Sequence, residues 1–133
     1  MGTWDIGHFD NDSAADFSAA LREASETERE NIIRTALTST IESDEFLDSD
    51  EACQAVASAA LIAAQLPGGT PVTTAYGPGV PMPAFSPEVR ALAVQALDRV
   101  LAPESELLEL WDEAGYGPKW REGIDELKAV LLT

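Results

Sequence analysis

The chain has 133 residues, of which 45% are hydrophobic and 24% charged, and its 24 acids against 8 bases give a formal net charge of −16. This length and apolar content predict one globular domain over residues 1–133 that folds without disulfides or metal, and they exclude a disordered chain. The negative charge argues against nucleic-acid binding, because it repels phosphates, and it favours a basic protein partner. A solvated acidic surface without a partner is the simpler alternative.

The N-terminal third is expected to hold an irregular segment and two helices. Residues 1–9 form an aromatic lead-in with no clear periodicity. Asp10–Asp12 offers side-chain oxygens to the free amides of a helix start, and apolar residues three and four apart predict a helix over 12–24. Ser25, with a glutamate three residues on, has the spacing of a capping box and predicts a helix over about 26–41.

The densest acidic segment of the chain, residues 42–51, is expected to be a connection. Asp48 gives a second capping signal and predicts a helix over about 50–65. That helix is apolar on almost every face, so we expect it to lie at the centre of the fold. Its only cysteine, Cys53, has three acidic neighbours in the sequence, Asp48, Asp50 and Glu51. Acids raise the pKa of a thiol, so we expect a small buried hydrophobic residue and not a catalytic thiolate.

Residues 67–85 are rich in proline and glycine, carry no charge and are expected to form a long loop. Ser86 and the proline after it then mark a strong helix start. Three further helices are predicted, over about 87–101, 104–114 and 118–131. The predicted fold class is therefore all-α: a compact bundle of five to six helices with an irregular aromatic N-terminus and a Pro/Gly-rich central loop.

The sequence contains neither a signal peptide nor a membrane-spanning segment that we can recognise. The first residues lack the basic and apolar regions of a signal peptide, and the longest apolar run, Ala55–Ala64, is too short to span a bilayer. We therefore expect a cytoplasmic protein with no membrane association. The oligomeric state is left open.

Two candidate chemical sites lie near the N-terminus. His8 is the only histidine, so any Ser-His-Asp or Cys-His arrangement would have to use it, although a structural or exposed histidine is the simpler role. Asp10, Asp12 and Asp16 form a carboxylate cluster of the kind that binds hard cations, and the last two share a helix face. The calcium-loop spacing is absent, so helix capping is the simpler role. The sequence assigns no catalytic residue, cofactor or metal, and it favours a non-enzymatic protein.

Aromatic residues gather near both ends of the chain and are expected to be core residues that meet and tie the termini together. They are Trp4, Phe9 and Phe17 near the start, and Trp111, Tyr116 and Trp120 near the end. A ligand pocket built from them is the alternative.

The opening stretch of the chain carries a recognisable motif. Its matching residues are Gly2, Trp4, Gly7, Phe9, Asn11, Asp12, Ala14, Asp16 and Phe17. On these positions, and on the late segment Ser105–Trp111, the chain resembles the bacterial domain of unknown function 4259 family, although Asp5 stands where the family usually has glycine. The resemblance implies a small helical bacterial protein and no particular activity.

The motif also has a physical interpretation. Phe9 would staple onto the first helix while Asn11 or Asp12 caps it, and Asp16 would hydrogen-bond back to the N-terminal backbone or to Trp4. The alternative is a binding surface, since polar loop residues beside aromatics often serve as one. The candidate residues, for function or structure, are Trp4, His8, Phe9, Asp10, Asn11, Asp12 and Asp16.

Three functions remain open from the sequence. The leading hypothesis is a protein-interaction or regulatory module, for instance an immunity-type protein, that meets a basic partner through the acidic segment 42–51 and the neutral loop 67–85. The second is an enzyme or small-ligand binder that uses the N-terminal Asp/His cluster, with or without a divalent cation. The third is a structural homo-oligomer built on the apolar helix 50–65.

Overall fold

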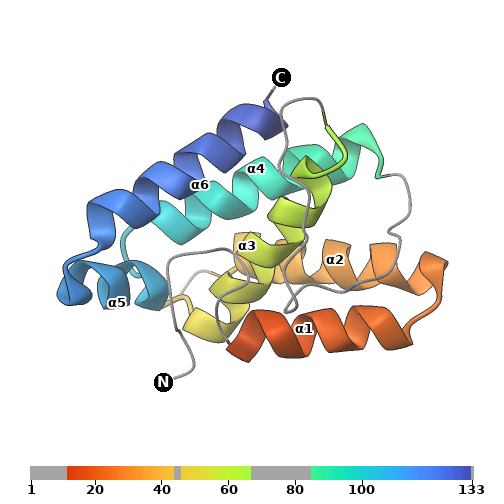
Figure 1. The fold of residues 1–133 in the computed structure, drawn as a ribbon, viewed down its shortest axis with the longest axis horizontal. Helices are drawn as coiled ribbons and strands as arrows, with labels where there is room; N and C mark the ends of the chain where they lie inside the picture. Colours follow the sequence, from red (N-terminus) through yellow and green to blue (C-terminus); the bar gives the residue numbers. More distant parts are fainter. Residues whose placement is uncertain (1–11, 44–45, 67–84, 133) are drawn as a thin grey trace.

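The computed structural model describes residues 12–43, 46–66 and 85–132, and within these ranges the chain forms six α-helices and no strand (Figure 1). The helices are α1 (Asp12–Glu23), α2 (Glu26–Ile41), α3 (Ser49–Ala63), α4 (Pro87–Leu101), α5 (Glu106–Ala114) and α6 (Gly117–Leu131). The predicted all-α bundle is confirmed. The aromatic N-terminus and nearly all of the Pro/Gly-rich loop lie outside the described residues.

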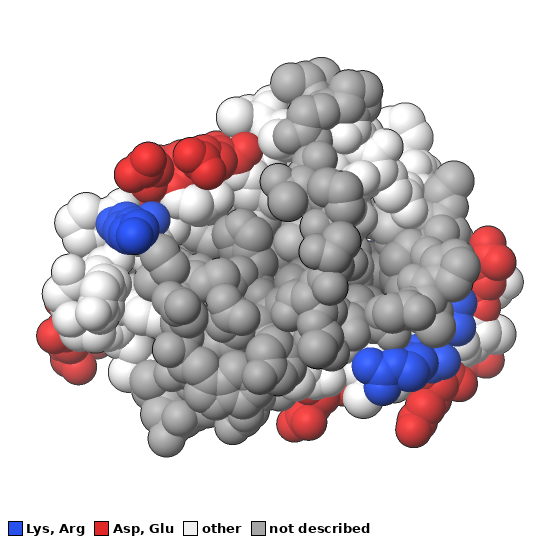
Figure 2. Space-filling view, in the orientation of Figure 1, with Lys and Arg blue, Asp and Glu red and all other residues white. Residues whose placement is uncertain are grey.

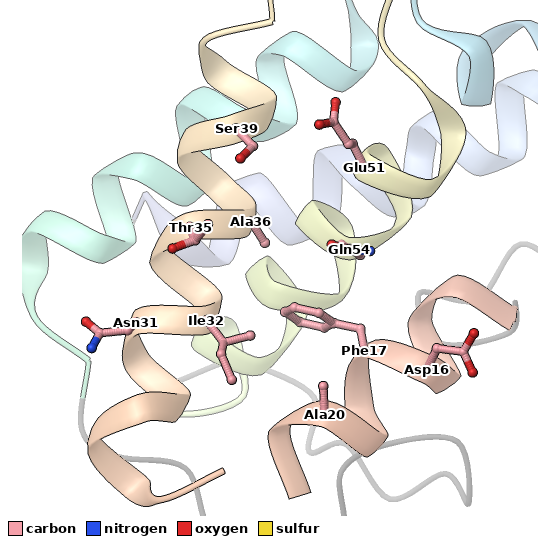
Figure 3. Close-up of a pocket in the computed structure, with 10 residues that line it drawn as sticks. All are labelled: Asp16, Phe17, Ala20, Asn31, Ile32, Thr35, Ala36, Ser39, Glu51 and Gln54. Carbon is pink, nitrogen blue, oxygen red and sulfur yellow. The ribbon is translucent and has the colours of Figure 1, made fainter. Parts of the chain in front are cut away.

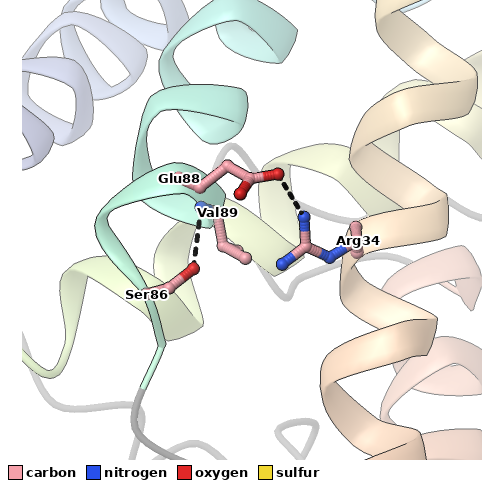
Figure 4. Close-up of polar contacts among 4 residues, drawn as sticks. All are labelled: Arg34, Ser86, Glu88 and Val89. Atoms are coloured by element: carbon pink, nitrogen blue, oxygen red, sulfur yellow. Dashed lines mark hydrogen bonds and ion pairs between the residues drawn. The ribbon is translucent and has the colours of Figure 1, made fainter.

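Three of the predicted helix caps are confirmed. Ser25 accepts a hydrogen bond from the N–H three residues on (3.3 Å), and Ser86 does the same at the start of α4 (3.4 Å; Figure 4). Asp48 also caps α3. The capping-box spacing predicted that it would accept from the N–H of Glu51, but it accepts from the N–H of Asp50 (2.7 Å). These side chains satisfy amides that would otherwise have no partner in the first turn of each helix.

The predicted start of the fifth helix, at Glu104, is wrong by two residues. Glu104 has a φ of +67°, which is left-handed, and Ser105 is extended, so neither residue continues a right-handed helix. At the other end α5 stops at Gly115, whose φ of +85° suits glycine and reverses the chain into α6.

Helix α3 lies at the centre of the bundle, as predicted, and contacts each of the other five described helices (Figure 1). Every residue from Ala52 to Ala63 is buried except Gln54, which is half-buried. The many alanines of this segment allow α2 and α4 to pack closely against it. None of the helices in the described ranges has the length and apolarity that crossing a membrane requires.

Two connections that are far apart in the sequence meet beside the start of α3. The Leu47 N–H donates to the Glu104 carbonyl (2.7 Å), and the Glu106 N–H donates to the Leu47 carbonyl (2.9 Å), as in a parallel sheet. The Arg99 guanidinium also donates to the Ser43 carbonyl (3.1 Å). We call these five residues the loop junction. The described part of the acidic connection is thus fixed by the α4–α5 connection, and Leu47 is fully buried.

The first turn of α3 is held from three sides. The Glu106 carboxylate of α5 accepts from the N–H of the first residue of α3 (2.8 Å). The Ser13 hydroxyl of α1 donates to the Asp50 carboxylate, and the Thr40 hydroxyl of α2 donates to the Glu51 carbonyl (3.4 Å). This turn therefore sets how α1 and α2 sit relative to α3.

Candidate functional site

The described residues form a groove with a volume of about 500 Å³ where α1, α2 and α3 meet (Figure 3). We call it the α1–α2 groove. It is lined by Asp16, Phe17 and Ala20 of α1, by Asn31, Ile32, Thr35, Ala36 and Ser39 of α2, and by Glu51 and Gln54 of α3.

The groove exists because α1 packs mainly on α3 and contacts α2 much less. The turn between α1 and α2 is short, so the two helices run side by side from a common end (Figure 1). Arg29 at the start of α2 donates to the Leu21 carbonyl at the end of α1 (2.8 Å), which fixes this end. Beyond it, the two helices leave the groove between them.

The floor of the groove is apolar and its rim is polar. The Phe17 ring lies between α2 and α3, with Ile32 and Ala36 of α2 beside it (Figure 3). Phe17 and Ala36 are buried and Ile32 is half-buried, whereas the rim residues Asp16 and Glu51 are exposed. This combination of an apolar floor with a few polar groups at the edge is typical of ligand and peptide sites.

The charge of the groove has one sign. Among its ten described lining residues, Asp16 and Glu51 are ionisable acids and none is a base. The two acids stand on different helices at one side of the groove, and the Asp16 carboxylate points outward from the rim (Figure 3). An apolar group with a positive charge beside it would suit this site, because the charge would stay near water while the apolar group covers the floor.

One of the candidate residues from the N-terminal motif, Asp16, lies at this groove, but the sequence did not predict the groove itself. Asp16 is the member of the Asp cluster that lies on its rim, one turn after Asp12 at the start of α1. The other candidates lie outside the described residues: Trp4, His8, Phe9, Asp10 and Asn11. Within the described ranges, no three His, Cys, Asp or Glu side chains come together as a metal ion would need.

The α2 contribution was missed, although the sequence holds a signal for it. Two isoleucines are adjacent, and the structure buries Ile33 in the core while Ile32 lines the groove. Adjacent residues point about 100° apart around a helix, so the two side chains can face different neighbours. A second stripe at Ile32, Thr35, Ala36 and Ser39, with helical spacing beside the core stripe, would have indicated a second contact face.

Cys53 is a buried residue, as predicted. Only 4% of its surface is exposed, and burial raises the pKa of its thiol to about 12. Asp50, Asp48 and Glu106 add to this rise through their negative charge. Glu106 lies on α5, far from Cys53 in the sequence, and it is among these causes, whereas the expected neighbour Glu51 is not.

The aromatic residues of α5 and α6 are structural. Trp111 and Trp120 are buried, and Trp111 meets the exposed Tyr116 edge to face, with ring centroids 6.2 Å apart. Phe17 lies on α1, which contacts neither α5 nor α6 among the described helices. The expected meeting of the aromatic groups at the two termini is therefore not made by Phe17, and its remaining members Trp4 and Phe9 lie outside the described residues.

The sequence profile of the family described as Domain of unknown function (DUF4259) matches residues 2–123. The chain belongs to this family. The match confirms the resemblance seen in the opening motif, and it covers every residue of the groove and of the loop junction. No curated protein and no solved structure matches the chain.

Proposed function

We propose that this member of the family is a protein-interaction module, and that it binds a basic segment of a partner protein in the α1–α2 groove. The observation that carries the proposal is the apolar floor bordered by Asp16 and Glu51, with no base among the described lining residues. We also propose that the protein is bacterial and cytoplasmic. Its role would be regulatory or of the immunity type, with the acidic surface holding the partner.

The charge of the whole chain supports the proposal. A formal net charge of −16 attracts a basic partner over a distance and raises its rate of association. Figure 2 shows acidic side chains at several places around the margin of one face, one group of them over α6, with basic side chains beside them at two places. Charge alone would attract any cation, so the apolar floor is what would give the groove its selectivity.

Photocrosslinking from inside the groove tests the proposal. A photoreactive amino acid at the exposed groove position Ala20 is compared with one at Ala91, which is exposed on α4 outside the groove. In native lysate we expect a basic protein to crosslink from Ala20 and not from Ala91, and the yield to fall as salt is raised. Equal crosslinking from both positions, or no partner from Ala20, would contradict the proposal.

A charge-matched pair of variants separates the groove from the net charge. Asp16→Lys with Glu51→Lys reverses the rim, while Asp125→Lys with Glu126→Lys makes the same change in net charge on the exposed face of α6. Helix α6 contacts neither α1 nor α2 among the described helices. We expect only the groove variant to lose the crosslink. Equal loss in both would mean that the partner senses overall charge and not the groove.

A small cationic ligand is the second candidate, because Asp16 of the predicted carboxylate cluster stands on the groove rim with Glu51. Carboxylate oxygens are the kind of ligand that hard divalent cations prefer. Calorimetric titration with Ca²⁺ and Mg²⁺ tests it. Binding that Asp16→Asn abolishes would favour this candidate over the protein partner.

The third hypothesis, a homo-oligomer built on the apolar helix, stays a prediction. The apolar residues of α3 are buried by the other helices of the same chain. Their apolar character is therefore explained without a second copy.

A further inference from the structure

We infer that the segment bound in the α1–α2 groove is an amphipathic α-helix of about two turns, with lysine or arginine at the edges of its apolar face. This inference rests on the proposed function and adds the conformation of the partner segment.

The face that α2 turns to the groove has the spacing of a helix-packing surface. Ile32, Thr35, Ala36 and Ser39 stand at positions i, i+3, i+4 and i+7 of α2. At 1.5 Å per residue this stripe is about 10 Å long, which equals about two turns of a partner helix lying beside it. The α1 side adds Phe17 and Ala20, so the partner would lie between two helices as a further member of the bundle.

The size of the lining side chains allows a helix to approach. Among the described lining residues, Ala20 and Ala36 have the smallest side chains, and they lie on different helices, Ala20 on α1 and Ala36 on α2. Helices pack with their axes about 8–10 Å apart, and small residues at the contact give the shorter distances. A large apolar residue of the partner helix would reach Phe17 at the floor and complete its burial.

The chemistry of the floor favours a helix over an extended segment. The side chains of Phe17, Ile32 and Ala36 have no polar atom that could pair with a peptide backbone, and their own backbone groups lie within helices. An extended segment lying on them would leave buried N–H and C=O groups without partners, and such groups cost free energy. A helix forms its backbone hydrogen bonds within itself. The described part of the chain also has no strand whose edge an extended peptide could join.

The positions of the two acids determine where the partner is basic. Asp16 lies on α1 and Glu51 on α3, and both are exposed. Lysine or arginine at the margin of the apolar stripe can lay its aliphatic stem along the rim and place its charge beside these carboxylates. Helical segments of this kind, with an apolar face and basic edges, are a common class of groove ligand.

Synthetic peptides of about 14 residues test the inference, since isolated helices of this length are only marginally formed in water and must fold on binding. The first peptide has leucine and alanine on one helical face and lysine beside it. The second has the same composition in an order that destroys the helical face. The third has the order of the first with glutamate in place of lysine. Binding is measured by fluorescence anisotropy and helix content by circular dichroism.

We expect the first peptide to bind at least about tenfold more tightly than the second and to gain helix content on binding. Its affinity should fall as the salt concentration is raised. The third peptide should not bind. Ala20→Trp fills the groove from α1 and should lower the affinity for the first peptide about tenfold. Ala91→Trp, on the exposed face of α4, should leave its affinity unchanged.

The outcomes separate this inference from the function on which it rests. If the first two peptides bind with equal affinity and Ala20→Trp reduces both affinities, the partner segment is not required to be helical. The proposal that the groove binds basic segments would then stand. Binding that Ala20→Trp does not reduce would overturn both. Absence of binding by the first peptide overturns the helix, and the lysate crosslink from Ala20 then decides the function by itself. A crosslink from Ala20 to residues 1–11 or 67–84 of the same molecule would assign the groove to the chain's own segments and overturn both.

Discussion

The loop junction and the α1–α2 groove both border the first turn of α3, and the acidic residues around this turn have two opposite roles. Asp48 and Asp50 accept hydrogen bonds at the start of the helix, and Glu106 of the junction accepts from the first N–H of α3. At the groove, Asp16 and Glu51 are exposed on the rim. The acidity of this chain is therefore of two kinds: part of it builds the start of α3, and part of it faces the place where a ligand would lie.

Replacing Leu47 by alanine should give the largest effect at the junction. Leu47 is fully buried, so the substitution leaves a cavity that costs about 2–5 kcal/mol of unfolding free energy. The adjacent Phe46 is half exposed (50%), and Phe46→Ala should cost much less, about 1 kcal/mol or below. Urea unfolding measures both. Similar costs for the two neighbours would show that the junction is not a packed part of the fold.

Removing the Glu106 carboxylate should give the second largest effect. Glu106→Ala leaves the first N–H of α3 without its acceptor, which typically costs about 1 kcal/mol. Glu109 is exposed on the same helix, and Glu109→Ala should change stability by less than about 0.5 kcal/mol. If both substitutions cost the same, the acids of α5 act only through general charge.

The Arg34–Glu88 ion pair should contribute less than either junction residue. Its N–O distance is 2.9 Å, but the two side chains are 35% and 75% exposed, so water screens their attraction (Figure 4). A double-mutant cycle with Arg34→Ala and Glu88→Ala should give a coupling energy of about 0.2–1 kcal/mol that decreases with salt. A coupling energy above this range would mean that this surface ion pair stabilises the fold as much as the charged groups of the junction do.

The smallest stability change is expected at the groove rim. Asp16→Ala should change the unfolding free energy by less than about 0.5 kcal/mol, because the carboxylate is exposed. The same substitution should lower the affinity for the first test peptide, since it removes one of the two rim charges. A loss above about 1 kcal/mol would mean that Asp16 belongs with the structural acids, and the division between junction and groove would fail.

Local patterns explain why most of the fold could be predicted. Ser25, Asp48 and Ser86 mark helix starts through contacts within three residues, which a sequence shows directly. The start of α5 was missed because the left-handed Glu104 is paired with Leu47, a residue far away in the chain. Local propensity contains no information about such a pairing.

The groove was harder to predict than the helices. A groove depends on where two helices fail to touch, and this follows from the packing of α1 on α3. Asp16 was singled out for a role in the N-terminal motif, and its place beside Glu51 became visible only in three dimensions. The adjacent Ile32 and Ile33 look alike in the sequence, but the structure gives each isoleucine a different environment, Ile33 in the core and Ile32 in the groove.

Cys53 makes the chain its own reporter of opening. It is the only cysteine, 4% exposed, and its thiol has a pKa of about 12 instead of the ordinary 9.0, so a thiol reagent at pH 8 reacts almost only with molecules that have opened around α3. The unfolded chain loses the thiol proton first as pH rises above 9, so this group also lowers stability between about pH 9 and 12. The rate of labelling in native buffer thus measures how often the centre of the bundle comes apart, without denaturant, and each 1.4 kcal/mol lost to a substitution should speed it about tenfold.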